Sequence, residues 1–174
     1  MTHWFMLTLV GKDRPGIVAK VTAALFEGGC NLGEASMLRL GGNFTIMLMV
    51  QAACNAHALA ALVQPVADSL GLQLHVDRIE GRLHQRVEPD VCISVHGADR
   101  AGIVARVTAA LAEAGLNILD LESGVGGTPE QPIYVMHIEG EARQGIETLA
   151  SAVAVLAREQ HVEVKLRPMD TLLG

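Results

Sequence analysis

The first 80 residues alternate between apolar runs typical of strands and apolar stripes typical of helices. His3–Val10 is an almost unbroken apolar run that ends at Gly11, which indicates a buried strand. Arg14–Glu27 carries apolar residues at helical spacing, and Gly28-Gly29 ends that predicted helix because glycine readily adopts the left-handed conformation. The later predicted elements are strands over Leu32–Leu40 and Phe44–Ala52 joined by the turn Gly41-Gly42-Asn43, a helix over Ala56–Leu70 that contains Pro65, and a strand over Leu72–Ile79.

The second half of the chain repeats this order. Residues 11–31 and 97–117 are identical at 15 of 21 positions, at an offset of 86 residues. A repeat of this length is a whole small domain, because solenoid units are about 20–50 residues long. We therefore predict two domains, residues 1–80 and 90–174, joined by a polar linker over 81–89. The predicted elements of the second domain are strands over Val91–His96, Leu116–Val125, Ile133–Glu139 and Val162–Arg167, helices over Ala101–Ala114 and Gly145–Glu159, and a loop over Gly126–Pro132.

The order strand-helix-strand-strand-helix-strand predicts an α+β fold class. Each domain is expected to be ferredoxin-like (βαββαβ), with a four-stranded antiparallel sheet and both helices on one face. Trp4–Val10 and Phe44–Val50 are mostly apolar at positions of either parity, so we expect another protein surface, the second domain or another subunit, to cover the other face of the first sheet. In the second domain Cys92, Ser94 and His96 alternate with apolar residues, which predicts a more hydrated outer face.

Composition narrows the class of protein. The net charge is -6, the basic residues are dispersed and aromatic residues are 3%, which argues against direct binding of nucleic acid. The cysteines Cys30, Cys54 and Cys92 show no CxxC spacing and indicate reduced thiols in the cytoplasm. We expect no signal peptide and no membrane-spanning segment of about 20 apolar residues. The seven histidines show no metal-ligand spacing, so no metal or cofactor is expected.

The repeated motif is Gly-x-Asp-Arg-(Pro/Ala)-Gly-Ile-Val, followed after the helix by Asn. Asp13 and Asp99 stand where a helix N-cap is expected, and Pro15 fits a first helical turn. A helix N-terminus can hold an anion such as a carboxylate, while Asn31 and Asn117 offer a donor and an acceptor to an amino acid. Each of these residues also has a purely structural interpretation as a cap or turn residue, and the motif leaves both interpretations open.

The segment DRPGIVAKVTAAL, followed by GGCNL, resembles the ACT domain, a small regulatory module that binds amino acids. Two such halves cover nearly all of the chain, which is similar to the glycine cleavage system transcriptional repressor family. In the second half Ala101 replaces the proline of the motif, which makes that loop less rigid. The resemblance implies a ligand at the loop before the first helix and the strand after it, at Asp13, Arg14, Pro15, Gly16, Ile17, Asn31 and Leu32, and at Asp99, Arg100, Gly102, Ile103, Asn117 and Ile118.

The same resemblance implies a function. Such proteins are thought to contact a DNA-binding transcriptional activator, with glycine as the expected signal. We therefore predict a non-enzymatic, homo-oligomeric regulator that senses a small amino acid and represses the glycine cleavage system through that partner. One alternative is a ligand-free adaptor or regulatory subunit that assembles through its apolar sheet face. Another is an acylphosphatase-like hydrolase using Arg14 and Asn31, although the phosphate-binding glycine loop is absent and Asp13 would repel a phosphate.

Overall fold

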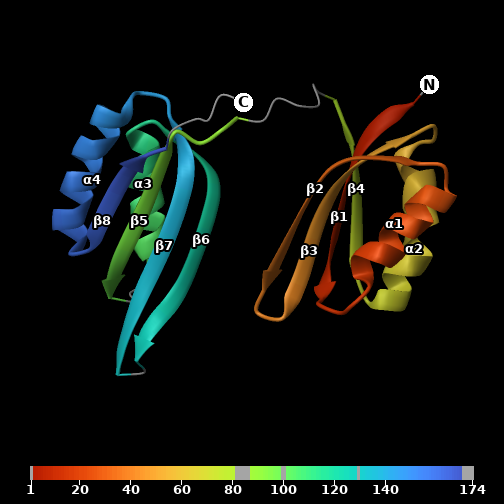
Figure 1. The fold of residues 1–174 in the computed structure, drawn as a ribbon, viewed down its shortest axis with the longest axis horizontal. Helices are drawn as coiled ribbons and strands as arrows, with labels where there is room; N and C mark the ends of the chain where they lie inside the picture. The colour runs from red at the N-terminus through yellow and green to blue at the C-terminus, as the bar shows by residue number, and fades with distance from the viewer. Residues whose placement is uncertain (1, 81–86, 99–100, 129, 170–174) are drawn as a thin grey trace. The chain divides into compact units, whose positions relative to one another are not determined.

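The computed structural model describes residues 2–80, 87–98, 101–128 and 130–169 of the 174-residue chain. The chain divides into two compact units, residues 1–83 and 84–174. Each unit is a four-stranded antiparallel sheet with both of its helices on one face (Figure 1). Of the linker predicted over 81–89, residues 81–86 lie outside the described part of the chain.

The two units have the same element order, which confirms the βαββαβ prediction. The sheet orders are β2-β3-β1-β4 and β6-β7-β5-β8, so the first strand of each unit is central. The first unit contains β1 His3–Lys12, α1 Ile17–Glu27, β2 Asn31–Leu40, β3 Asn43–Ala52, α2 Ala56–Leu70 and β4 Gln73–Ile79. The second unit contains β5 Val91–Ala98, α3 Ile103–Glu113, β6 Leu116–Thr128, β7 Gln131–Ala142, α4 Ile146–Gln160 and β8 Glu163–Pro168.

The first helix of each unit begins later than the sequence predicts. The N-cap of α1 is Gly16, at φ 86° and without a side-chain capping bond, so the prediction that Asp13 caps this helix is wrong. Pro15 lies in the turn before the N-cap rather than in the first helical turn. Asp99 lies outside the described residues, but α3 likewise begins after Gly102, at φ 83°. A left-handed backbone favours glycine, and this glycine therefore sets the start of the helix.

The loop predicted over Gly126–Pro132 is also wrong, because most of this segment belongs to a long β6–β7 hairpin. The pairing of the two strands continues through Gly127 opposite Pro132 to Thr128 opposite Gln131. Pro132 lies one position beyond the last described β5–β7 pair, Ala98 with Ile133. A missing N–H there interrupts no bond to β5, so the proline is compatible with a strand.

Each unit has its own hydrophobic core between the sheet and the two helices. In β1 the alternate residues Phe5, Leu7 and Leu9 are buried and contribute to the same core as Leu25 of α1. No polar or charged residue is buried among the described residues. The strict alternation in β1 shows that only one parity of its apolar run faces the helices.

The faces of the two sheets that carry no helix differ in chemistry. The open face of the first unit presents mainly apolar side chains from its first three strands, with Thr8, His75 and Asp77 as polar neighbours; the apolar ones include Trp4, Met6, Met47, Leu38 and Leu40. Met47, Leu38 and Leu40 are 44%, 56% and 70% exposed. The open face of the second unit presents polar and charged side chains, as its alternation predicts; they include Ser94, His96, His137, Glu139, Glu163 and Lys165.

Candidate functional site

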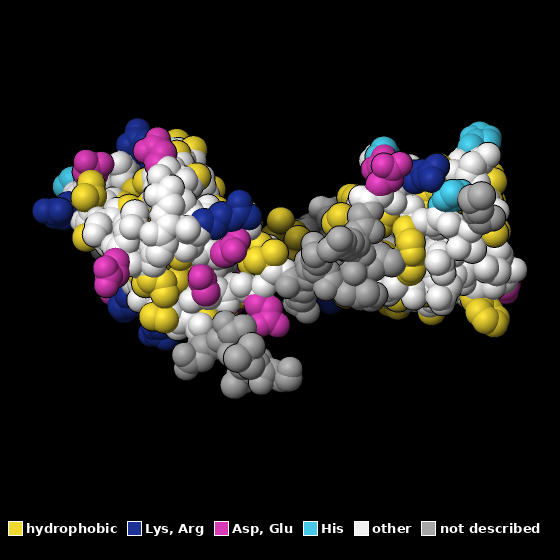
Figure 2. Space-filling view, turned by 90° about the horizontal axis from the view of Figure 1, so that it is seen from above, with side chains coloured by type: hydrophobic (Ala, Val, Ile, Leu, Met, Phe, Trp, Pro, Cys, Tyr) yellow, Lys and Arg dark blue, Asp and Glu magenta, His cyan; other side chains and the backbone are white. Residues whose placement is uncertain are grey.

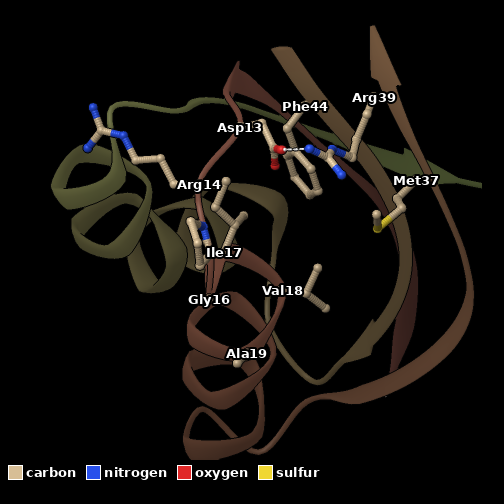
Figure 3. Close-up of a pocket in the computed structure, with 10 residues that line it drawn as sticks. Asp13, Arg14, Gly16, Ile17, Val18, Ala19, Met37, Arg39 and Phe44 are labelled. Atoms are coloured by element: carbon tan, nitrogen blue, oxygen red, sulfur yellow. Dashed lines mark ion pairs between the residues drawn. The ribbon is translucent and has the colours of Figure 1, made fainter. Parts of the chain in front are cut away.

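A hollow of about 460 Å³ lies at the start of α1 and is open to solvent (Figure 3). Its lining includes the complete run from Asp13 to Ile17 that the sequence motif singles out. The sequence did not predict the other five lining residues, which are Val18, Ala19, Met37, Arg39 and Phe44.

The tip of the β2–β3 hairpin forms the second wall of this hollow. Gly41 and Gly42 take φ values of 57° and 76°, as a tight two-residue hairpin turn requires. The Asp13 N–H donates to the Gly42 carbonyl oxygen at 3.1 Å, which fixes the tip against the loop before α1. This contact brings the end of β2, with Met37 and Arg39, to the start of the helix (Figure 3). The Gly-Gly turn was the available sequence signal, because it determines which β2 residues lie near the tip.

An ion pair crosses the hollow. The Arg39 guanidinium (Nη2) lies 2.5 Å from Asp13 Oδ2, and the two side chains are 67% and 24% exposed. The dashed line in Figure 3 marks this pair, while the Arg14 side chain extends away from it on the other side of α1. Asp13 is therefore an ion-pair partner of β2 and not a helix cap.

The start of α1 adds hydrogen-bond donors to the same space. The first N–H groups of an α-helix lack intrahelical partners and carry partial positive charge, and no side chain caps those of α1. Together with Arg39 they offer donors to a carboxylate, while Asp13 offers an acceptor to an ammonium group. Val18 and Met37 supply an apolar wall beside these groups.

Asn31 and Leu32 lie at the opposite end of the sheet. Asn31 and Trp4 both lie opposite Gln51 of β3, on either side of it, whereas the hollow lies beyond Lys12 at the other end of β1. Eight residues of strand separate these two levels, a distance of about 26 Å. Within one unit the structure therefore does not bring Asn31 to Asp13, nor to Arg14 as an acylphosphatase-like pair would need. Asn117 and Ile118 likewise lie at the start of β6, far from Gly97.

Comparisons with known proteins bear on both units. Family models for the ACT domain match residues 3–77 and residues 93–158. The chain belongs to the ACT-domain family. It carries two ACT domains in tandem, one in each unit.

Relatives extend this likeness over most of the chain. The glycine cleavage system transcriptional repressor of Escherichia coli K12 is 28% identical over 138 residues, which are 79% of this chain and 73% of the relative. The UPF0237 protein YjhC of Lactococcus lactis is 38% identical over 72 residues, 41% of this chain and 83% of the relative. A crystal structure of an unknown protein from Galdieria sulphuraria is similar with a TM-score of 0.77 and 26% identity, covering 98% of this chain and all of that one. The similarity to a repressor and to ACT domains supports a regulatory role.

The second ACT domain has no arginine at the position on β6 that corresponds to Arg39. Asp99 and Arg100 lie outside the described residues, while Gly102 and Ile103 begin α3 as Gly16 and Ile17 begin α1. Strand register identifies the counterpart of Arg39. Arg39 lies opposite Phe44 of β3, which pairs with Gly11. Val125 lies opposite Tyr134 of β7, which pairs with Gly97, the residue equivalent to Gly11. An uncharged residue therefore stands where the first ACT domain has its cation.

Other groups in the described part of the chain offer little reactive chemistry. Burial raises the pKa of the Cys30 thiol, and the charge of Cys54 acts in the same direction, so Cys30 is a weak nucleophile near neutral pH. The described residues include no group of three or more side chains suited to hold a metal ion. Their helices are all too short or too polar to cross a membrane.

Proposed function

We propose that this protein is an amino-acid-sensing regulator that acts on transcription through a protein partner, in the repression of the glycine cleavage system. One structural observation carries the proposal. The hollow at the start of α1 combines a carboxylate, a guanidinium and free helix N–H groups, which are the partners of an amino acid's two charged groups. The similarity to the Escherichia coli repressor over most of the chain supports the transcriptional part.

The proposed ligand is a small amino acid, with glycine as the first candidate. Because Asn31 lies far from Asp13 in its own domain, an amide that contacts the ligand would have to come from another copy of the chain. The ligand would then lie at a boundary between copies of the chain and favour the arrangement that binds it best. Such a difference in affinity is what couples a binding site to a partner surface.

The proposed partner is a DNA-binding transcriptional activator in the cytoplasm. The net charge of -6 disfavours direct binding to DNA. In the view of Figure 2, acidic and basic side chains are interspersed and the basic ones form no continuous stripe. An influence on a promoter would therefore pass through the partner.

We further propose that the chain is a homo-oligomer. The apolar open face of the first sheet, with Leu38 and Met47 among its exposed side chains, is the proposed contact. The same face of a second copy is the best-matched surface, since an isologous interface pairs like with like and the corresponding face of the second domain is charged.

Titration of the full chain with each of the twenty amino acids tests the sensing function. We expect glycine or another small amino acid to raise the unfolding temperature and to give a saturable heat in calorimetry, because a ligand that binds only the folded state stabilises it. A flat response to all twenty would refute the sensing function. Mobility-shift assays with promoter DNA should show an effect of the chain only when the activator is present.

The apolar open face also favours a second candidate, a ligand-free adaptor. The variant Asp13→Ala separates the two functions, since Asp13 lines the hollow and belongs to neither core. Under the sensing function the variant should leave partner control insensitive to the amino acid. Under the adaptor function, partner control in the variant should equal that of the wild-type chain at every concentration of amino acid.

A further inference from the structure

We infer that Asp13 and Arg39 form a clamp for the α-amino and α-carboxylate groups of one amino acid, and that each chain binds one such ligand, in its first ACT domain. The inference rests on the proposed amino-acid sensing. It identifies the charged partners of the ligand, of which Arg39 lies outside the repeated motif. It also predicts the number of binding sites in a chain that has two similar domains.

The pair is the chemical complement of a zwitterion. The planar guanidinium of Arg39 can donate two parallel hydrogen bonds to a carboxylate, and the carboxylate of Asp13 accepts from an ammonium group. In the structure these two groups bind each other, at 2.5 Å. A zwitterion that enters between them replaces each partner by one of the same charge, so the net charge of the site does not change. A ligand with only a carboxylate would leave Asp13 unpaired beside a second anion, and the site therefore favours amino acids over simple carboxylates.

The clamp can open at little cost. Arg39 is 67% exposed, and a surface ion pair contributes little to the free energy of unfolding. Asp13 is held more firmly, because its side chain is 24% exposed and its N–H is bound to Gly42. Arg39 is thus the movable half of the clamp and Asp13 is the fixed half.

The remaining surface of the hollow fits the rest of an amino acid. Uncapped N–H groups at the start of α1 lie beside the pair and can share the carboxylate with Arg39. Val18 and Met37, which are 39% and 53% exposed, form the apolar wall next to it. Glycine and alanine are the probes, because the proposed function takes a small amino acid as its ligand.

The second ACT domain lacks the movable half of the clamp. Its register equivalent of Arg39 is Val125, and its equivalent of Met37 is Ser123. The motif is nevertheless present in both domains, including Asp13 and Asp99 at equivalent positions. The difference therefore arises on β2 and β6 and was invisible in the motif.

Calorimetry on the full chain tests the stoichiometry and the need for both charges. We expect glycine or alanine to bind with one site per chain, and acetate and methylamine to bind at least tenfold more weakly than glycine. Two equivalent sites per chain, or acetate binding as tightly as glycine, would overturn the clamp.

Variants of Arg39 test its role directly. Arg39→Val places the residue of the second domain at this position and should weaken glycine and alanine binding at least tenfold, while Arg39→Lys should recover part of the loss. Valine suits a strand, so the variant should fold, and circular dichroism checks this. The matched control is Arg143→Val, since Arg143 is 63% exposed and pairs with Glu141 at 3.0 Å outside the hollow. Its affinity should equal that of the wild-type chain.

The outcomes separate the clamp from the proposed function. If the wild-type chain binds none of the twenty amino acids, sensing fails and the clamp fails with it. If the wild-type chain binds and Arg39→Val binds equally well, sensing stands and the clamp alone is refuted. A loss of affinity that is as large in Arg143→Val as in Arg39→Val also refutes the clamp, because it reflects overall charge.

Discussion

The two ACT domains share a backbone plan but differ in the chemistry of their open sheet faces, of which the first is the more apolar. Most of the 15 identical positions of the repeat lie in the loop and first helix, where the backbone turn and the core limit the choice of residue. On the open faces, equivalent positions differ in kind: Met47 of β3, opposite Thr8, corresponds to His137 of β7, opposite Ser94. The shared backbone and core therefore do not determine which side chains lie on the surface, and the two domains are suited to different contacts.

A charge on each open face tests this difference, and we expect its effect to be the largest. If the first face joins two copies of the chain, Met47→Glu buries an unpaired carboxylate and should weaken association at least a hundredfold, about 3 kcal/mol. The equivalent change His137→Glu adds a charge to a face that is already polar and should leave association unchanged. Analytical ultracentrifugation over a range of concentrations measures both.

Two results of the ultracentrifugation would contradict the assignment of the interface to the open face of the first domain. If the wild-type chain sediments as a monomer at every concentration, no interface between copies forms. A greater loss of association in His137→Glu than in Met47→Glu would assign the interface to the second domain. Far-ultraviolet circular dichroism serves as the control for folding in both variants.

The fold was predictable because its signals are local. The predicted and observed bounds of α2 are both Ala56–Leu70, since Asn55 caps the helix and Gly71 ends it in the left-handed conformation. The start of α1 was mispredicted because apolar spacing does not report the backbone angle of Gly16, which excludes the preceding residues from the helix. A pattern of residue types predicts an element well, but it predicts the end of an element only when the terminal residue is itself distinctive.

Only those residues of the site that are adjacent in the sequence were predictable. The motif identified Asp13 and the start of the helix, because those residues are adjacent in sequence. Arg39 reaches the hollow through the β2–β3 hairpin, and only strand register reveals that contact. Asn31 was expected nearby because it follows the helix closely in sequence, but the 11 residues of α1 carry the chain about 16 Å from the start of the helix.

A second comparison concerns how the first helix of each domain packs against the second. At the end of α1, a Cβ on Gly28 would clash with Leu62 Cδ2 of α2. The second ACT domain has Ala114 at the end of α3, and Ala152 of α4 is the counterpart of Leu62 when the two helices are aligned from their first residues, Ala56 and Ile146. A larger residue on one helix is thus matched by a smaller one on the other.

Substitutions at Gly28 and Leu62 should show that the sizes of the two residues compensate for each other, and we expect an intermediate effect on the free energy of unfolding. We expect Gly28→Ala to lower the free energy of unfolding of the first domain by about 1–3 kcal/mol, as overpacking does. In a Leu62→Ala background the same change should be neutral or stabilising, because the clash is gone and alanine reduces the entropy of the unfolded chain. Trp4 is the single tryptophan of the chain, so urea titration followed by its fluorescence reports the first domain alone. Equal costs in the two backgrounds would show that Leu62 is not the obstacle.

The smallest expected effect concerns the caps of the second helices. Asn55 Oδ1 accepts a hydrogen bond from the Ala58 N–H at 2.8 Å, whereas α4 begins after Gly145 without a side-chain cap. Asn55→Ala should lower the free energy of unfolding of the first domain by about 1 kcal/mol, and Asn55→Gly by only a few tenths. The order follows because glycine leaves the first N–H groups open to water and is tolerated at this position in α4. Trp4 fluorescence in urea measures both variants, and a larger loss for glycine than for alanine would show that the capping bond contributes less than the rigidity of the backbone at this position.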